Sequence, residues 1–219
     1  MSRTVTSATS ARITQVLLAC GLLYAALYVV LNDVVAAGMY PGYDPLSQAV
    51  SELSATGSPA AAFLTAVFPV WPTLMVAFGI GVRRAAEGRR ALRVTGVLLV
   101  VHGLVQVLWL AFPMSSRTDI TAGASAASDV GHLLLTAATV AFILAEIGFS
   151  AAAFGWRFRL YAIASALTVV TFGALTGRQA AQLAAGDPTP WMGLFERISI
   201  APWLLSMAVL HLILSAERA

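Results

Sequence analysis

Two sets of polar residues in this chain could do chemistry, because both lie within or beside long apolar segments. The first set is expected at one end of the predicted helices and contains Asp44, Ser51, Glu52, Asp129, His132, Arg178, Glu196 and Arg197. The second set lies inside apolar segments and contains His102, Gln106 and Glu146. Ionisable groups are costly inside a bilayer, so each is a candidate functional residue.

The first set could form a polar cavity at one end of a helical bundle. Asp129 and His132 are three residues apart, so they share one face of a predicted helix. Such a cavity could bind a lipid headgroup or another small amphiphile, but the same residues could instead form salt bridges that hold the loops to the bundle. An intramembrane lipid-modifying enzyme would use His132 with a neighbouring acid. A catalytic serine at Ser51 is disfavoured, because any serine-rich segment permits the same arrangement.

The second set could relay protons through the membrane. His102 and Gln106 are four residues apart on one helix face. Glu146 follows His132 by fourteen residues, which returns it to within about 40° of the same face. A small proton-coupled transporter would use such residues, whereas in the alternative each bonds a neighbouring helix or, for Glu146, reaches Arg157. No internal repeat of the kind that many carriers contain is visible.

Several other classes of site and partner are not expected. The three histidines lie on three predicted helices at different depths, so they cannot share a tetrahedral metal site, and we predict neither a metal nor a cofactor. No basic stripe with interleaved aromatic residues is present, so nucleic acid is not an expected partner. Cys20 is the only cysteine, so no intrachain disulfide can form.

The elements that position these residues are predicted by the hydropathy of the chain. Of the 219 residues, 59% are hydrophobic and 11% are charged, and the mean hydropathy is +0.83. Six apolar segments have the roughly 20-residue length of a membrane-spanning helix: 13–31, 59–82, 94–112, 129–152, 160–176 and 197–214. The predicted fold class is therefore all-α, a polytopic bundle of six transmembrane helices.

The remaining segments complete the predicted organisation. A short extracytoplasmic amphipathic helix is expected between the first two spans, at 45–55, because Asp44 can cap it and Pro45 suits its first position. The single transmembrane domain covers 13–214. A disordered cytoplasmic N-terminus, 1–12, precedes it, and a cytoplasmic tail, 215–219, follows it.

The arginines predict the orientation in the membrane. Ten of the 13 basic residues, all arginine, lie before the first helix, after the last, or in the connections after the second and fourth. Positively charged loops remain in the cytoplasm. Both termini are therefore expected to be cytoplasmic, with 33–58, 113–128 and 177–196 facing outward.

Two segments and one histidine carry a resemblance to a known family. The first segment runs from Tyr43-Asp44-Pro45-Leu46-Ser47 through Ser51-Glu52-Leu53-Ser54-Ala55-Thr56-Gly57, and the second is Gly193-Leu194-Phe195-Glu196-Arg197-Ile198. With His132, they resemble the six-helix prokaryotic membrane family catalogued as domain of unknown function 998. The resemblance implies a prokaryotic plasma membrane protein with an outer-face motif cluster and implies no activity. We expect a non-enzymatic protein whose partners are membrane lipids or a small amphiphilic ligand.

Overall fold

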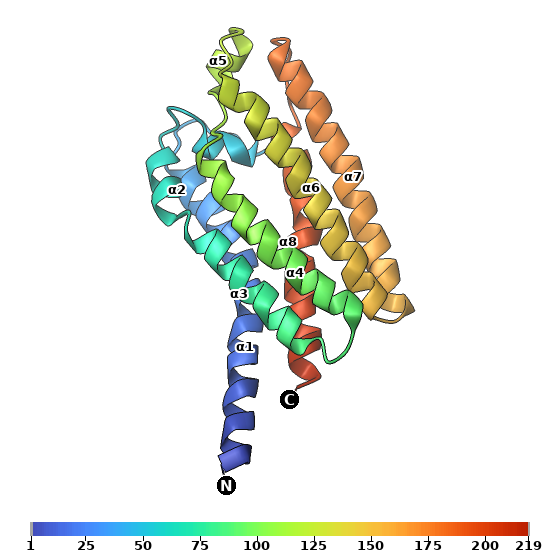
Figure 1. Ribbon diagram of the computed structural model, residues 1–219. Coiled ribbons are helices and arrows are strands. Elements are labelled where there is room, and N and C mark those ends of the chain that lie inside the picture. The colour runs from blue at the N-terminus through green and yellow to red at the C-terminus, as the bar shows by residue number, and fades with distance from the viewer. Residues whose placement is uncertain (1, 219) are drawn as a thin grey trace.

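The computed structural model describes the backbone of residues 2–218 and the side chains of residues 9–218, and it is helical throughout, without a strand in the described part of the chain (Figure 1). Six helical segments are long and apolar enough to cross a membrane. They are α1 (Ser2–Val29) continued by the π-helix η1 (Val30–Ala36), α2 (Ala61–Val67) with α3 (Val70–Ala85), α4 (Arg90–Val105) continued by the 3-10 helix η3 (Gln106–Leu110), α6 (Ala127–Ala153), α7 (Trp156–Ala184) and α8 (Met192–Ala216). Two short helices, η2 (Val50–Ser54) and α5 (Arg117–Thr121), lie in the connections.

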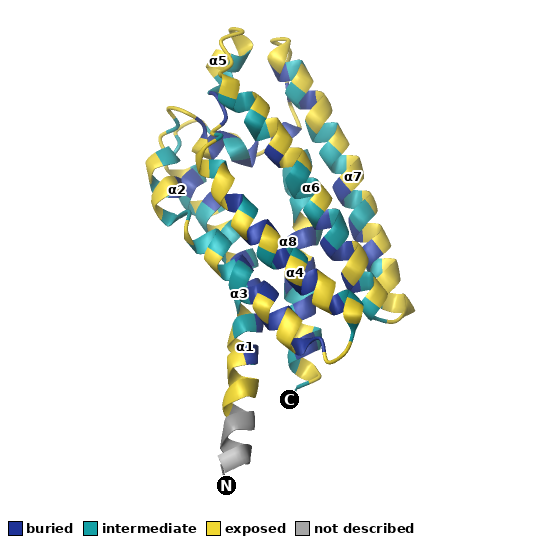
Figure 2. Ribbon diagram, in the orientation of Figure 1, coloured by how far each residue is buried: buried dark blue, intermediate teal, exposed yellow. Residues whose placement is uncertain are grey.

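The helices pack as a bundle of neighbouring pairs. Helix α1 packs on α3 and α8, α4 lies between α3 and α6, and α7 packs on α6 and α8. The core is formed by fully buried side chains such as Phe78, Leu99 and Met207. Large apolar side chains are also exposed on the spanning helices, including Leu134 at 68% exposure. Exposed residues occur along the length of these helices (Figure 2). An apolar surface of this kind suits contact with lipid rather than water.

The second span is interrupted where the sequence places two prolines. Helix α2 ends at Val67 and α3 begins at Val70, with a turn at Phe68 and Pro69. Proline lacks an amide hydrogen, and its ring clashes with the preceding turn. Pro69 and Pro72 therefore account for the break.

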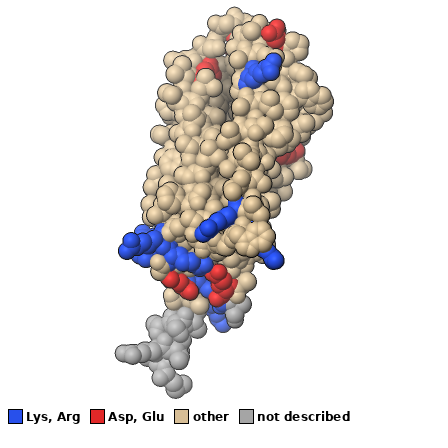
Figure 3. Space-filling view, turned by 90° about the vertical axis from the view of Figure 1, so that its right-hand side faces the viewer, with Lys and Arg blue, Asp and Glu red and all other residues tan. Residues whose placement is uncertain are grey.

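The two ends of the bundle differ in charge. Both termini lie at one end (Figure 1), where basic side chains gather on the face that Figure 3 presents. We call it the arginine-rich end; it includes the connections 86–89 and 154–155. Arg89 and Arg218 form ion pairs there with Glu217 at 2.7 Å and Glu87 at 2.8 Å. The opposite, acid-rich end consists of the connections 37–60, 111–126 and 185–191.

At the acid-rich end, three spans extend at least five residues beyond their predicted ends. The first span continues to Ala36 instead of ending at 31. Within it, the side-chain amide of Asn32 donates to the Tyr28 carbonyl at 2.8 Å. Helix α7 continues from the predicted 176 to Ala184 and stops before Gly186, whose φ of 79° suits a helix end. Helix α8 begins at Met192, five residues before the predicted start. Polar residues near the ends of apolar segments thus remain helical.

The continuous short helix predicted over 45–55 does not form. Turns cover this segment up to Ser47, and η2 begins only at Val50. The Asp44 carboxylate accepts the Leu46 amide at 3.0 Å, and the Gln48 side chain accepts the Asp44 amide at 2.8 Å. Side chains that bond nearby amides compete with helix formation.

The sequence predicts disorder over residues 1–12. The side chains of the first eight of these lie outside the described part of the chain, so the disorder stays a prediction. From Ser2 onward the backbone continues α1.

Candidate functional site

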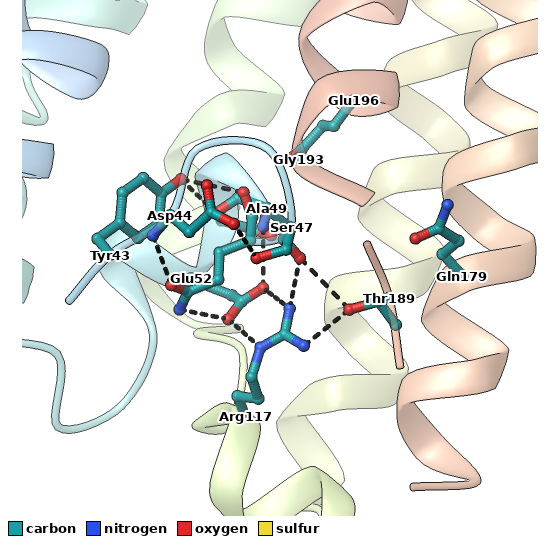
Figure 4. Close-up of polar contacts among 12 residues, drawn as sticks. Tyr43, Asp44, Ser47, Ala49, Glu52, Arg117, Gln179, Thr189, Gly193 and Glu196 are labelled. Carbon is teal, nitrogen blue, oxygen red and sulfur yellow. Dashed lines mark hydrogen bonds and ion pairs between the residues drawn. The ribbon is translucent and has the colours of Figure 1, made fainter. Parts of the chain in front are cut away.

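At the acid-rich end, a buried ion pair joins two connections. Arg117, at the start of α5, holds the Glu52 carboxylate with two nitrogens, at 2.6 and 2.8 Å (Figure 4). Glu52 is 2% exposed. The Arg117 guanidinium also donates to the Ser47 carbonyl at 2.9 Å and to the Thr189 hydroxyl at 2.8 Å. Its hydrogen bond to Glu52 raises the pKa of Arg117 further above its usual range. One side chain thus links three separate connections.

A second arginine holds the segment 43–50 against the start of α8. Arg197 donates to Asp33 at 2.8 Å, to the Tyr43 hydroxyl at 2.9 Å and to the Pro45 carbonyl at 2.8 Å. Burial raises the pKa of Tyr43 to about 12, although the hydrogen bond from Arg197 opposes the shift. The neighbouring Glu196 accepts the Val50 amide. Both charged residues at the start of α8 are therefore bonded to the connection that covers it.

Close packing accompanies these bonds. A Cβ atom placed on Gly193 would overlap the Gln48 carbonyl oxygen and lie 2.5 Å from that of Pro45. The Leu194 amide donates to the Leu46 carbonyl at 3.0 Å. The first turn of α8 therefore accepts the covering segment only because a glycine occupies this position.

Asp129 and His132 also bond to protein groups. The Asp129 carboxylate accepts the Ser115 amide at 2.7 Å and its hydroxyl at 2.6 Å. His132 donates from Nδ1 to the Phe112 carbonyl at 3.0 Å, and its ring meets Trp109 edge-on at 4.8 Å. These contacts attach the start of α6 to the connection before it, and they place a carbonyl rather than an acid beside the imidazole.

Asp44 and Ser51 contact protein groups as well. Asp44 is exposed, and hydrogen bonds from the Ser47 hydroxyl and the Leu46 amide lower the pKa of its carboxyl. The Ser51 hydroxyl faces the Met114 sulfur at 3.4 Å, without a nearby base. Neither arrangement activates a nucleophile.

Arg178 differs from the other residues of the first set. It is exposed on the last turns of α7 and makes no hydrogen bond or ion pair with the side chains described in residues 9–218. It lines a cleft of about 390 Å³ between the end of α7, the start of α8 and their connection. The other lining residues are Leu175, Gln179, Gln182, Pro188, Pro190 and Phe195. The cleft therefore has an apolar lining together with the Arg178 guanidinium and the side-chain amides of Gln179 and Gln182.

Two residues of the second set, His102 and Glu146, form a pair inside the bundle. Nδ1 of His102 lies 3.0 Å from Oε1 of Glu146, and the Trp203 indole donates to Oε2 at 2.7 Å. Gln106 does not contact this pair and instead donates to the Tyr24 hydroxyl at 2.9 Å. All five residues are at least 94% buried.

The two candidate sets predicted from the sequence did not contain several of the residues that complete these clusters, namely Asp33, Tyr43, Arg117, Thr189, Tyr24 and Trp203. A signal existed for Trp203, because an indole N–H in an apolar helix needs an acceptor. No signal identified Arg117 as the partner of Glu52, 65 residues away. Among the described residues, no three His, Cys, Asp or Glu side chains are grouped to hold a metal ion.

Comparison with known proteins agrees with the family resemblance of the sequence. A family model described as protein of unknown function (DUF998) matches residues 7–213, nearly the whole chain. No curated protein and no solved structure matches the chain.

Proposed function

We propose that this chain, which belongs to the family described as protein of unknown function (DUF998), is a non-enzymatic membrane protein that binds an anionic amphiphile beside Arg178. The observation that carries the proposal is the contrast between Arg178 and the other arginines of the acid-rich end. Arg117 and Arg197 are saturated by protein groups. Arg178 has no such partner within residues 9–218 and lines a cleft with apolar walls.

The chemistry of the cleft matches an acidic headgroup attached to a chain. A guanidinium binds phosphate or carboxylate oxygens with its planar set of donors, and the Gln182 side chain can add a neutral hydrogen bond. Leu175 and Phe195 supply apolar contact for the first carbons of the chain. The cleft lies near one end of two spanning helices, and lipid headgroups lie at this depth of a bilayer.

The two alternative functions receive less support. A lipid-modifying enzyme would need an acid or hydroxyl beside His132, and the described contact is the Phe112 carbonyl. A transporter would need polar groups that face one continuous cavity, whereas His102 and Glu146 are buried and paired with each other.

The orientation belongs to the same proposal. We place the arginine-rich end in the cytoplasm of a prokaryotic cell and the cleft at the outer leaflet, because basic loops remain inside. With Cys20→Ser as background, Tyr40→Cys should react with a membrane-impermeant thiol reagent on intact cells. Reaction only after lysis would place the cleft at the inner leaflet.

The binding proposal is tested by titrating purified protein with phosphatidylglycerol, phosphatidylcholine or decyl phosphate and counting bound molecules by native mass spectrometry. Binding of phosphatidylglycerol and not decyl phosphate would identify a lipid ligand, whereas binding of both would identify the shared acidic headgroup. One interfacial arginine contributes about 1 kcal/mol toward an anionic lipid, so Arg178→Ala should weaken binding about fivefold.

The matched control is Arg159→Ala, an exposed arginine at the other end of the same helix that makes no side-chain hydrogen bond or ion pair within residues 9–218. It should leave phosphatidylglycerol binding within twofold of the unsubstituted protein. Equal losses in the two variants would mean that binding follows overall charge and would contradict a site at the cleft.

A further inference from the structure

The pair of His102 and Glu146 occupies a position that the amphiphile cleft does not use. His102 is 0% exposed and Glu146 is 4% exposed. Phe142 stacks on the imidazole at 5.0 Å between ring centroids, and Trp203 lies 5.5 Å away. The Glu146 carboxyl group therefore contacts two ring nitrogens, His102 Nδ1 and Trp203 Nε1, and it accepts from both when it is ionised.

Unpartnered polar atoms lie next to this pair. Within the described part of the chain, three buried side-chain atoms have no hydrogen-bond partner: Nε2 of His102, Oε1 of Gln106 and Oγ1 of Thr139. His102 and Gln106 are one helical turn apart and project from one helix face. Leaving a buried polar atom unpartnered is costly, so the native protein is expected to supply a partner.

The charge of the pair depends on one proton. If Glu146 is ionised and His102 is neutral, an uncompensated negative charge lies in the bundle, which is strongly unfavourable. A proton on Nε2 converts the pair into a neutral imidazolium–carboxylate pair. It also creates an Nε2–H donor that requires an acceptor, and the free Gln106 oxygen lies one turn away.

We propose that His102, Glu146 and Gln106 form a reversible proton-binding site inside the bundle, completed by one buried water between Nε2 and Oε1. When the imidazole is neutral, the water donates one hydrogen to Nε2 and the other to the Gln106 oxygen. A hydronium ion arriving at the site passes a proton to the bridging water, which transfers one of its own hydrogens to Nε2, and the hydronium leaves as water. The bridging water then accepts the Nε2–H bond and keeps its bond to Gln106. Nε2 of His102 and the Gln106 oxygen keep a hydrogen-bond partner in both states, so the site can exchange a proton without rearranging the helices.

The unpartnered atoms also indicate the side from which the proton arrives. Gln106 follows His102 by four residues on a helix that runs toward the acid-rich end, a displacement of about 6 Å. Thr139 lies seven residues from Glu146 in the same direction along α6, about 10 Å. On the other side, the Ser150 hydroxyl is already bonded to the Ile147 carbonyl. The unpartnered atoms therefore lie on the acid-rich side of the pair, which is the side from which we infer that the proton arrives.

Few other groups can titrate near the site. Helix α6 contributes Glu146 and α1 contributes Tyr24, which bonds Gln106. Helix α8 presents the neutral Trp203. The ionisable residues of α3, Arg83 and Arg84, lie in its last turn at the arginine-rich end. Protonation at this site can therefore be assigned to the pair.

The test is a ¹⁵N nuclear magnetic resonance titration of the full chain in lipid nanodiscs, with His132→Gln and His211→Gln so that His102 is the single histidine. The ring should pass from one protonated nitrogen at high pH to two at low pH between about pH 5 and 8. Glu146→Gln should lose the doubly protonated signal within that range, and Gln106→Leu should require a lower pH to produce it.

The titration of His102 alone decides the proposal, even if a variant does not fold. A ring that keeps one protonation state over the range overturns it, and so does a folded Glu146→Gln variant that titrates unchanged. No lipid ligand enters this measurement, so its result is independent of the cleft at Arg178.

Discussion

Replacing Arg117 by alanine is expected to destabilise the protein by about 3 kcal/mol, because it leaves the buried Glu52 carboxylate without a counter-charge. The carboxylate would lose donors at 2.6 and 2.8 Å. It would keep the Ala49 amide at 2.9 Å and the Gln48 side chain at 3.2 Å. Two neutral donors do not replace a guanidinium, so the charge remains poorly compensated.

The magnitude follows from the burial of the two partners. Breaking a buried ion pair by removing one partner costs about 3–5 kcal/mol. Glu52 is 2% exposed, but 28% of the Arg117 side chain reaches solvent. Water can enter the space that the arginine leaves, so we expect the lower end of this range. Glu52→Gln should cost less, about 1–2 kcal/mol, because the arginine that remains is partly hydrated.

The assay is reversible unfolding in mixed micelles, followed by circular dichroism, for the two single variants and the double variant. Adding Arg117→Ala to a Glu52→Gln background should cost about 1–2 kcal/mol less than adding it to the unsubstituted protein. In that background residue 52 carries no buried charge that the loss of the guanidinium could leave uncompensated. Arg159→Ala is the matched control and should stay within about 0.5 kcal/mol. An Arg117→Ala variant as stable as this control would refute the reasoning.

Two further changes test how the segment 43–50 is held. Gly193→Ala should destabilise the protein by about 1–3 kcal/mol in the same assay, because the new methyl group overlaps the Gln48 carbonyl. The control Gly148→Ala has open space around its Cβ position and should be nearly neutral. Equal stability of the two variants would show that the segment 43–50 does not lie against α8. The raised pKa of Tyr43, about 12 instead of the usual 10 or so, favours the neutral phenol in the folded protein, so its contribution is complete below about pH 10 and is lost as pH rises toward 12. Stability measured between pH 9 and 12 should therefore fall more steeply in the unsubstituted protein than in Tyr43→Phe, and parallel curves would contradict this linkage.

The six spans could be predicted because lipid leaves the backbone few alternatives. An apolar segment of about 20 residues must satisfy its own amides and carbonyls, so it forms a helix. The ends of the spans could not be predicted equally well, because outside the hydrocarbon region packing decides where a helix stops. Arg178 illustrates the consequence: it was expected in a loop, and the continuation of α7 to Ala184 places it on a helix beside the cleft.

The partners of the candidate residues depend on how the helices are rotated and packed, which hydropathy does not determine. His102 and Glu146 were both candidate relay residues, but their direct contact could not be predicted from a separation of 44 residues. Glu52 and Glu196 were expected around a cavity, and the structure bonds them to Arg117 and the Val50 amide instead. The sequence thus identifies polar side chains that need a hydrogen-bond or ion-pair partner, but it does not identify which residue supplies that partner.

The most direct test of the cleft is photocrosslinking with phosphatidylglycerol that carries a diazirine near its headgroup, followed by mass spectrometric mapping of the labelled peptides. Our account predicts that the label concentrates in residues 175–195 and is reduced there by Arg178→Ala. Label confined to the arginine-rich end, at 83–93 and 157–159, would contradict it, because attraction to the basic loops would then explain all binding.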